Sequence, residues 1–99
     1  GTPQNDSLQH WKEMTERFNM ECFPFMINGR NADKAGDKQT AEMMKGKLDS
    51  LRNDYRRRSH ILAESLEEGP LREFLMKQFP KTYKQKMPDG SIKEMPFFH

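Results

Sequence analysis

The stretch that decides the fold is "MMKGKLDSLRNDYRRRSHILAESL", residues 43 to 66. Its apolar side chains recur at intervals of three, four or seven residues: Met44, Leu48, Leu51, Tyr55, Leu62 and Leu66. This spacing is typical of a helix that packs one side against the rest of the protein. Gly69 then favours a helix end and Pro70 a new helix start. We therefore predict a main helix over residues 38–67.

A first helix is expected before this segment. Its apolar stripe has intervals of three and four: Leu8, Trp11, Met14, Phe18 and Cys22. The stripe predicts a helix over residues 7–22, because Pro24 disfavours helical geometry in the residue before it. Residues 29–39 contain glycines and aspartates but no large apolar side chain, so we expect a mobile loop there. Residues 1–6 are expected to be disordered, and the first two are interpreted as an expression scar.

The C-terminal part predicts a third helix and a hairpin. Leu71, Phe74, Leu75 and Phe79 share one side of a helix over residues 70–79. The sequence Pro-Asp-Gly at 88–90 is typical of a tight turn, so residues 80–99 are expected to form a hairpin or an extended arm. The expected fold is an all-α, three-helix domain over residues 7–79, with a long central helix and a short C-terminal β-hairpin or arm.

The composition excludes several classes of protein. Hydrophobic residues make up 33% of 99 residues and charged residues 32%, a balance that favours a small core with segments left unpacked or completed by a partner. No apolar run approaches the ~20 residues needed to cross a bilayer, so no membrane partner is expected. The only cysteine, Cys22, excludes an internal disulfide and indicates a reducing compartment, nuclear or cytoplasmic.

Enzyme chemistry is not expected. The sequence contains none of the common nucleotide-binding, hydrolase, zinc or calcium motifs, and the histidines are too scattered to form a metal site with Cys22. On one helix Cys22 and His10 would be about 18 Å apart, too far for the imidazole to activate the thiol. An approach of His60 through the fold stays open. We predict no catalytic residue, no metal and no cofactor.

Basic residues form the main candidate site. On a helix, Lys45, Arg52 and Arg56 fall on one flank of the apolar stripe, and the other basic side chains fan around the helix. Such a fan suits the phosphates of duplex DNA. The candidate nucleic-acid contacts are Lys45, Lys47, Arg52, Arg56, Arg57 and Arg58. The alternative is a solvated face with ion pairs, because Asp49 and Asp54 each lie four residues from a basic side chain and the net charge is only +2.

The chain also resembles Myb/SANT-like, MADF-type domains over residues 11–69. The resemblance lies in "WKEMTERFN" and "QTAEMMKGKLDSLRNDYRRRS", through Trp11, Phe18, Thr40, Lys45, Lys47, Leu48, Leu51, Tyr55 and Arg56. It implies three helices around an aromatic core, with a last helix that enters the major groove or binds proteins such as histone tails. The side chains that it places toward the ligand are Lys45, Lys47, Arg52 and Arg56.

Two functions are therefore expected. The first is a non-enzymatic, nuclear DNA- or chromatin-binding module that uses the basic flank. The second is a protein-interaction or homodimerisation domain completed by a partner helix, with Phe97 and Phe98 as partner contacts. Binding that weakens steeply with salt would favour the first, and a dimer mass would favour the second.

Overall fold

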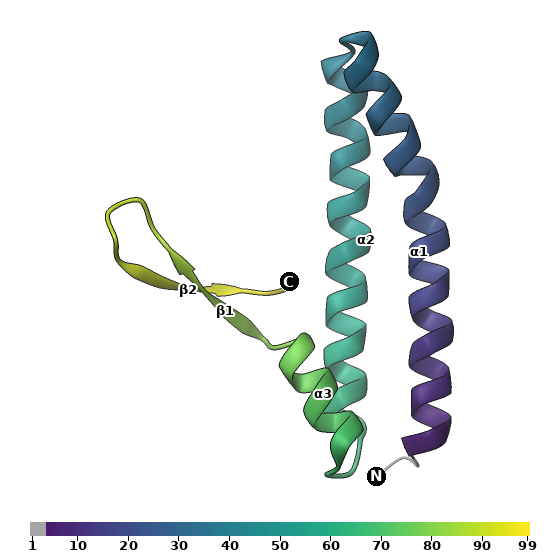
Figure 1. Cartoon of the computed structure of the whole chain (residues 1–99), viewed down its shortest axis with the longest axis vertical. Coiled ribbons are helices and arrows are strands. Elements are labelled where there is room, and N and C mark those ends of the chain that lie inside the picture. The colour runs from purple at the N-terminus through teal and green to yellow at the C-terminus, as the bar shows by residue number, and fades with distance from the viewer. Residues whose placement is uncertain (1–3) are drawn as a thin grey trace.

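A computed structural model describes residues 4–99. It contains three helices followed by a two-stranded hairpin: α1 Gln4–Ala35, α2 Lys38–Ser65, α3 Pro70–Gln78, β1 Thr82–Lys86 and β2 Ile92–Pro96. The two long helices lie side by side and antiparallel, α3 packs beside the C-terminal end of α2, and the hairpin projects away from the helices (Figure 1). The predicted three-helix domain with a C-terminal hairpin is confirmed.

Helix α1 is much longer than the sequence predicted. The expected disorder over residues 1–6 is wrong for residues 4–6, which begin α1, and residues 1–3 lie outside the described residues. The predicted end near residue 22 and the mobile loop over 29–39 are also wrong, because α1 continues through Pro24 to Ala35. The second half of α1 leans toward α2 (Figure 1), as in a helix bent at an internal proline.

Small side chains explain why this second half is helical. A Cβ atom at Gly29 would lie 3.4 Å from Cβ of Met44 on α2, and Ala32 is buried. Glycine and alanine let the two helices approach closely, so tertiary packing outweighs the poor helix propensity of this segment. The absence of large apolar residues therefore indicates a close helix crossing here and not a loop.

The connection between the long helices is a tight turn. Gly36 has φ 73°, a left-handed conformation that favours glycine. The N–H of Asp37 donates to the carbonyl of Ala32 at 2.9 Å, and the N–H of Gly36 donates to that of Asp33 at 3.1 Å, the pattern of a Schellman helix end. The Asp37 carboxylate accepts from the Thr40 N–H at 3.1 Å and caps α2.

Aromatic side chains and α3 form the core at the lower end of the helical pair. The rings of Phe18 and Tyr55 stack with their centroids 4.2 Å apart, and Trp11 donates from Nε1 to Ser59 Oγ at 3.3 Å. Helix α3 closes this end with Leu75, which is fully buried. The residues packed around it include Trp11, Leu62, Ala63, Leu66, Leu71, Met76 and Phe79.

The hairpin is nearly free of the core. Its strands pair antiparallel, from Thr82 opposite Pro96 to Lys86 opposite Ile92. At the turn, Gly90 has φ 87°, and its N–H donates to the Met87 carbonyl at 2.9 Å. Every residue of β1 is exposed, so the position of the hairpin depends on its two ends.

Candidate functional site

Helix α2 has two different sides. With about 100° per residue, residues 53, 56 and 60 point one way, residues 51, 58 and 65 point roughly the opposite way, and residues 54, 57 and 61 lie between them. The first side is contacted by residues 97–99 and by Phe79 at the end of α3, and we call it the covered side. The second borders a groove between α1 and α2, which we call the open groove.

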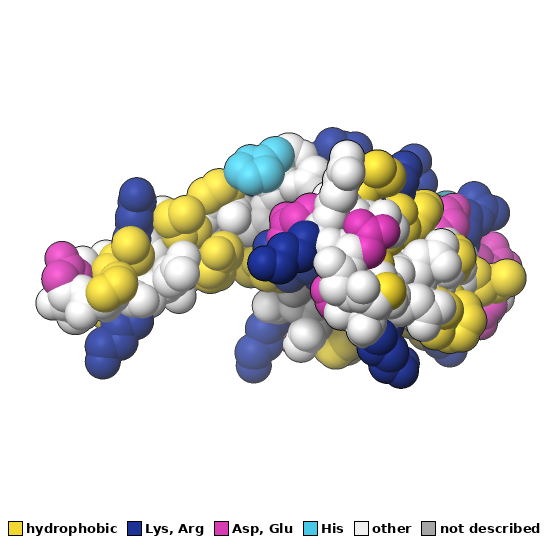
Figure 2. All heavy atoms as spheres, turned by 90° about the horizontal axis from the view of Figure 1, so that it is seen from above, with side chains coloured by type: hydrophobic (Ala, Val, Ile, Leu, Met, Phe, Trp, Pro, Cys, Tyr) yellow, Lys and Arg dark blue, Asp and Glu magenta, His cyan; other side chains and the backbone are white. Residues whose placement is uncertain are grey.

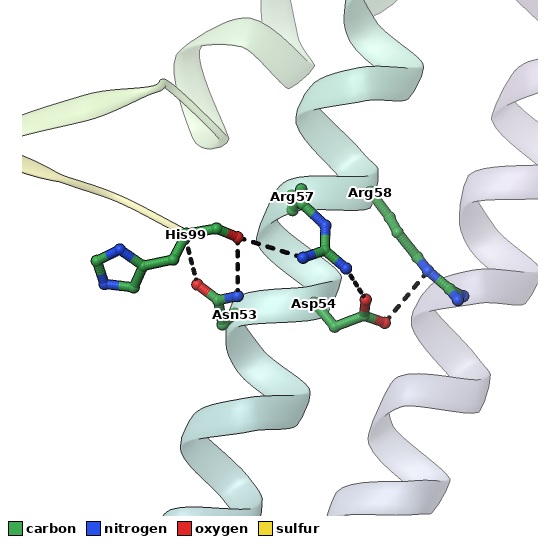
Figure 3. A network of polar contacts seen from close by, with 5 residues as sticks. All are labelled: Asn53, Asp54, Arg57, Arg58 and His99. Atoms are coloured by element: carbon green, nitrogen blue, oxygen red, sulfur yellow. Dashed lines mark hydrogen bonds and ion pairs between the residues drawn. The ribbon is translucent and has the colours of Figure 1, made fainter.

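The covered side holds the end of the described chain in a polar network (Figure 3). Asn53 donates to the backbone carbonyl of His99 at 3.1 Å and accepts from its N–H at 2.6 Å. Arg57 donates to the same carbonyl at 3.3 Å. Three hydrogen bonds at one residue fix the chain end against the middle of α2.

Phe97 and Phe98 contact the same side of α2. The guanidinium carbon of Arg56 lies 4.1 Å from the ring centroid of Phe97, and Arg56 also donates to the Phe97 carbonyl at 3.3 Å. The Phe98 ring lies 5.3 Å from the imidazole of His60. The residues predicted to bind a partner are thus packed on this chain's own helix.

His60 joins the covered side to α3. It is 3% exposed, and its Nδ1 lies 2.6 Å from the Phe79 carbonyl, which can only accept, so Nδ1 carries the proton. Its Nε2 faces the Glu64 carboxylate at 3.3 Å. The Phe79 carbonyl satisfies Nδ1, whereas the buried Nε2 has no hydrogen-bond partner. Among the described residues no hydrogen bond joins His60 to Cys22.

Several of the predicted nucleic-acid contacts have acidic partners on α2. Asp54 binds Arg57 at 2.6 Å and Arg58 at 3.2 Å, and Asp49 lies 3.5 Å from Arg52 (Figure 3 shows the Asp54 pairs). All these side chains are at least one-third exposed, so each pair contributes little to stability. The predicted Asp54–Arg58 pairing is confirmed, whereas Asp49 pairs with Arg52.

The two predicted lysines extend from the upper half of α2. Lys45 is exposed, and Lys47 lies with its ammonium 5.5 Å from the Phe25 ring centroid. Figure 2 shows the Lys and Arg side chains at separate places around the molecule, and they do not gather into one patch on that face. At about 100° per residue, Lys45, Arg52 and Arg56 share one flank of α2 and Lys47 and Arg58 share another, so the six candidates do not lie on one surface.

The open groove has an apolar floor. It encloses about 460 Å³. Its apolar lining consists of Met14 and Phe18 from α1 with Leu51, Tyr55, Ile61 and Leu62 from α2. Ile61 is 55% exposed. Ile61 was not among the predicted site residues. Its neighbour Leu62 was assigned to the packed stripe, and because adjacent residues on a helix point about 100° apart, Ile61 could be expected to lie outside that stripe.

Charged side chains form the rim of the open groove. On α1 the rim consists of Glu13, Arg17 and Glu21, all exposed, and on α2 it includes Asp54 and Arg58. Glu16 and Met20, which is 75% exposed, line a second hollow beside the α1 rim. Among the residues that the structure describes, the three glutamates have no basic partner within 4.0 Å.

Cys22 lies between the two long helices and is 7% exposed. Burial raises the pKa of its thiol, a nearby Arg52 guanidinium lowers it, and Glu21 raises it. A buried thiol with a raised pKa is a poor nucleophile. Within residues 4–99 no group of three or more His, Cys, Asp or Glu could hold a metal ion, and no helix there is long and apolar enough to cross a membrane.

Comparisons with protein-family models, with curated proteins and with solved structures find no match to this chain. The resemblance to Myb/SANT-like domains therefore stays a prediction. Three of the residues that carry it, Trp11, Phe18 and Tyr55, do lie together in the aromatic core.

Proposed function

We propose that this chain is a protein-interaction module whose open groove receives a helix from another protein. The observation that carries the proposal is an apolar floor between two antiparallel helices, on which Ile61 is 55% exposed. Exposed apolar surface with a polar rim is typical of interaction sites, and a groove between helices commonly receives an amphipathic helix.

The overall shape supports completion by a partner. The radius of gyration is 16.7 Å, whereas a compact domain of this length has about 13 Å. The accessible surface is 7402 Å², about 1,500 Å² more than a compact monomer of this mass exposes. A standard interface buries about 800 Å² on each partner. The excess surface, shared between the groove and the projecting hairpin, is thus large enough for one partner.

The open groove also has the length of a short helix. Its lining runs from His10 to Glu21 on α1 and from Leu51 to Ser65 on α2. At ~1.5 Å per residue these segments are about 16 and 21 Å long. A partner helix of about 12 to 15 residues would fill the groove and would lie against both long helices.

Binding of designed amphipathic helical peptides of about 15 residues tests this proposal. We expect micromolar binding to the wild type, measured by fluorescence anisotropy, and a loss of at least ~10-fold in Ile61→Glu, because a carboxylate would enter the apolar floor. The matched control is Ile92→Glu on the hairpin, where Ile92 is 69% exposed. Equal binding by both variants, or no binding by any peptide, would reject the groove as the site.

The alternative occupant of the groove is a second copy of the chain. Light scattering over a range of protein concentrations measures the mass of the free protein. A monomer that binds peptides supports the proposal as stated, whereas a dimer that Ile61→Glu dissociates assigns the groove to homodimerisation.

DNA or chromatin binding in the nucleus is the second candidate, favoured by the exposure of Lys45, Lys47 and Arg52 on α2. It has less support, because Arg56 and Arg57 are held by residues 97–99 and the other arginines contact aspartates. Mobility shifts with duplex DNA over a salt series test it. Binding through several phosphates must weaken steeply as salt rises, and no shift at low salt rejects this candidate.

A further inference from the structure

We infer that the partner helix is cationic, with basic, acidic and basic side chains at positions i, i+4 and i+8 along the flank that faces α1. This inference rests on the proposed function, because it concerns the chemistry of the ligand of the open groove. It follows from the charges on the groove rim and from their spacing along α1.

The groove is acidic although the chain is basic. The groove lining and the adjoining hollow contain four carboxylates, on Glu13, Glu16, Glu21 and Asp54, and two guanidinium groups, on Arg17 and Arg58. Their net charge is −2, whereas the whole chain has a formal net charge of +2. Complementary charge on a partner is favoured at an interface rim, where it sets specificity more than affinity.

The acidic character lies on the α1 rim. On the α2 rim, Asp54 binds Arg57 at 2.6 Å and Arg58 at 3.2 Å. These three side chains sum to +1, so the sum for the groove and the adjoining hollow becomes −1 when Arg57 is included. On α1, the three glutamates have no basic partner within 4.0 Å among the described residues. The unmatched charge is therefore one-sided, and a partner helix is expected to be basic on the flank toward α1.

The spacing on α1 gives the register. Glu13, Arg17 and Glu21 are four residues apart, so they follow one another along the same side of the helix at about 6 Å intervals. A helix lying alongside α1 matches them with a basic residue, an acidic residue four positions later and a basic residue after another four. The pattern is symmetric, so it fits parallel and antiparallel partners equally.

A second copy of this chain fits the rim less well. An isologous dimer through the groove would place one net-negative surface against an identical one, and like charges at an interface oppose association. On the basic flank of α2, which has the opposite charge, Arg56 is held by Phe97, whereas Lys45 and Arg52 are exposed. A separate cationic helix avoids the repulsion between two identical rims.

The test uses two designed helical peptides with the same length and the same apolar face. One has Lys, Glu and Lys at i, i+4 and i+8 on the flank, and the other has Glu, Lys and Glu. We expect the first to bind wild-type protein about 10-fold tighter at low salt, with the difference shrinking as salt rises. In the triple variant Glu13→Lys/Arg17→Glu/Glu21→Lys the preference should reverse. These three side chains are exposed, and circular dichroism checks that the variant remains folded.

The outcomes separate this inference from the proposed function. Equal binding of both peptides, or tighter binding of the second, overturns the inference while the groove keeps its proposed role. Binding of neither peptide overturns the proposed function and with it the inference. A dimer that Ile61→Glu dissociates shows that a second copy occupies the groove, which also overturns the inference.

Discussion

On the covered side of α2, polar side chains meet polar partners from the same chain, whereas on the other side no element within residues 4–99 covers the apolar floor of the open groove. Asn53, Arg56 and Arg57 bind the backbone of residues 97–99, and His60 binds Phe79. The groove instead leaves Ile61 mostly exposed. One side of α2 is therefore covered by residues of its own chain. The other side is not covered by residues 4–99, and a partner is expected there.

The largest expected effect is a loss of stability that is greater for a substitution in the buried core than for one on the floor of the open groove. Leu75→Ala should lower the free energy of unfolding by about 3 kcal/mol, because it leaves a cavity around a side chain that is 0% exposed. Leu51→Ala, on the half-buried groove floor, is the matched control and should cost about 1 kcal/mol. Urea denaturation measures both, and equal losses would contradict the distinction between the two sides.

A smaller effect is expected when the covered side is uncovered. Phe97→Ala/Phe98→Ala removes the ring under Arg56 and the ring beside His60, and should destabilise the protein by about 1 to 2 kcal/mol. The same variant frees arginine side chains, so any weak DNA binding should increase in mobility-shift assays. A variant as stable as the wild type would show that residues 97–99 do not hold this side closed.

A substitution in the turn between α1 and α2 should destabilise the whole helical pair, and therefore both sides of α2. Hydrogen bonds from the Thr40 side chain and backbone N–H lower the pKa of the Asp37 carboxyl. A pKa that is depressed in the folded state gives stability that is present above the unfolded pKa, about 3.9, and lost as the pH falls through the folded value. Asp37→Ala should therefore lower the melting temperature modestly at neutral pH and remove this acid-dependent part. If the difference in melting temperature between the wild type and Asp37→Ala is the same at pH 7 and at pH 3, the Asp37 cap does not supply this pH-dependent stability.

The smallest effect is expected for the ion pairs beside the groove. Arg58→Ala breaks a pair with Asp54 that is more than one-third exposed, and it should change the free energy of unfolding by only about 0.3 kcal/mol. The measurement is urea denaturation at low and high salt. A loss above ~1 kcal/mol would mean that Arg58 supports the α1–α2 packing, and the groove rim would then be part of the scaffold.

Local signals in the sequence were sufficient for most of the fold. The apolar stripe of α2, the Gly69–Pro70 boundary and the Pro-Asp-Gly turn each predicted an element that the structure contains. The second half of α1 was missed because Pro24 and Gly29 are unfavourable inside a helix. The glycine is explained by its close approach to Met44, which lies fifteen residues further along the chain.

The candidate site was less predictable. Helical periodicity placed the basic residues on α2 correctly, but it could not show that Arg56 would stack on Phe97, forty-one residues away. It placed Leu62 in the packed stripe correctly, but it could not show that the exposed Ile61 would border a groove, because that depends on where α1 lies. Surfaces defined by contacts between distant segments require the tertiary structure.

The hairpin is attached to the helices at both of its ends. At the start of β1 the chain leaves α3, and the N–H of Phe97 donates to the Lys81 carbonyl at 2.8 Å, beside the docked residues 97–99. Two attachments side by side at the base oppose rotation of the hairpin about its own long axis. A twist applied at the turn around Gly90 would therefore be transmitted to residues 97–99 and through them to the middle of α2.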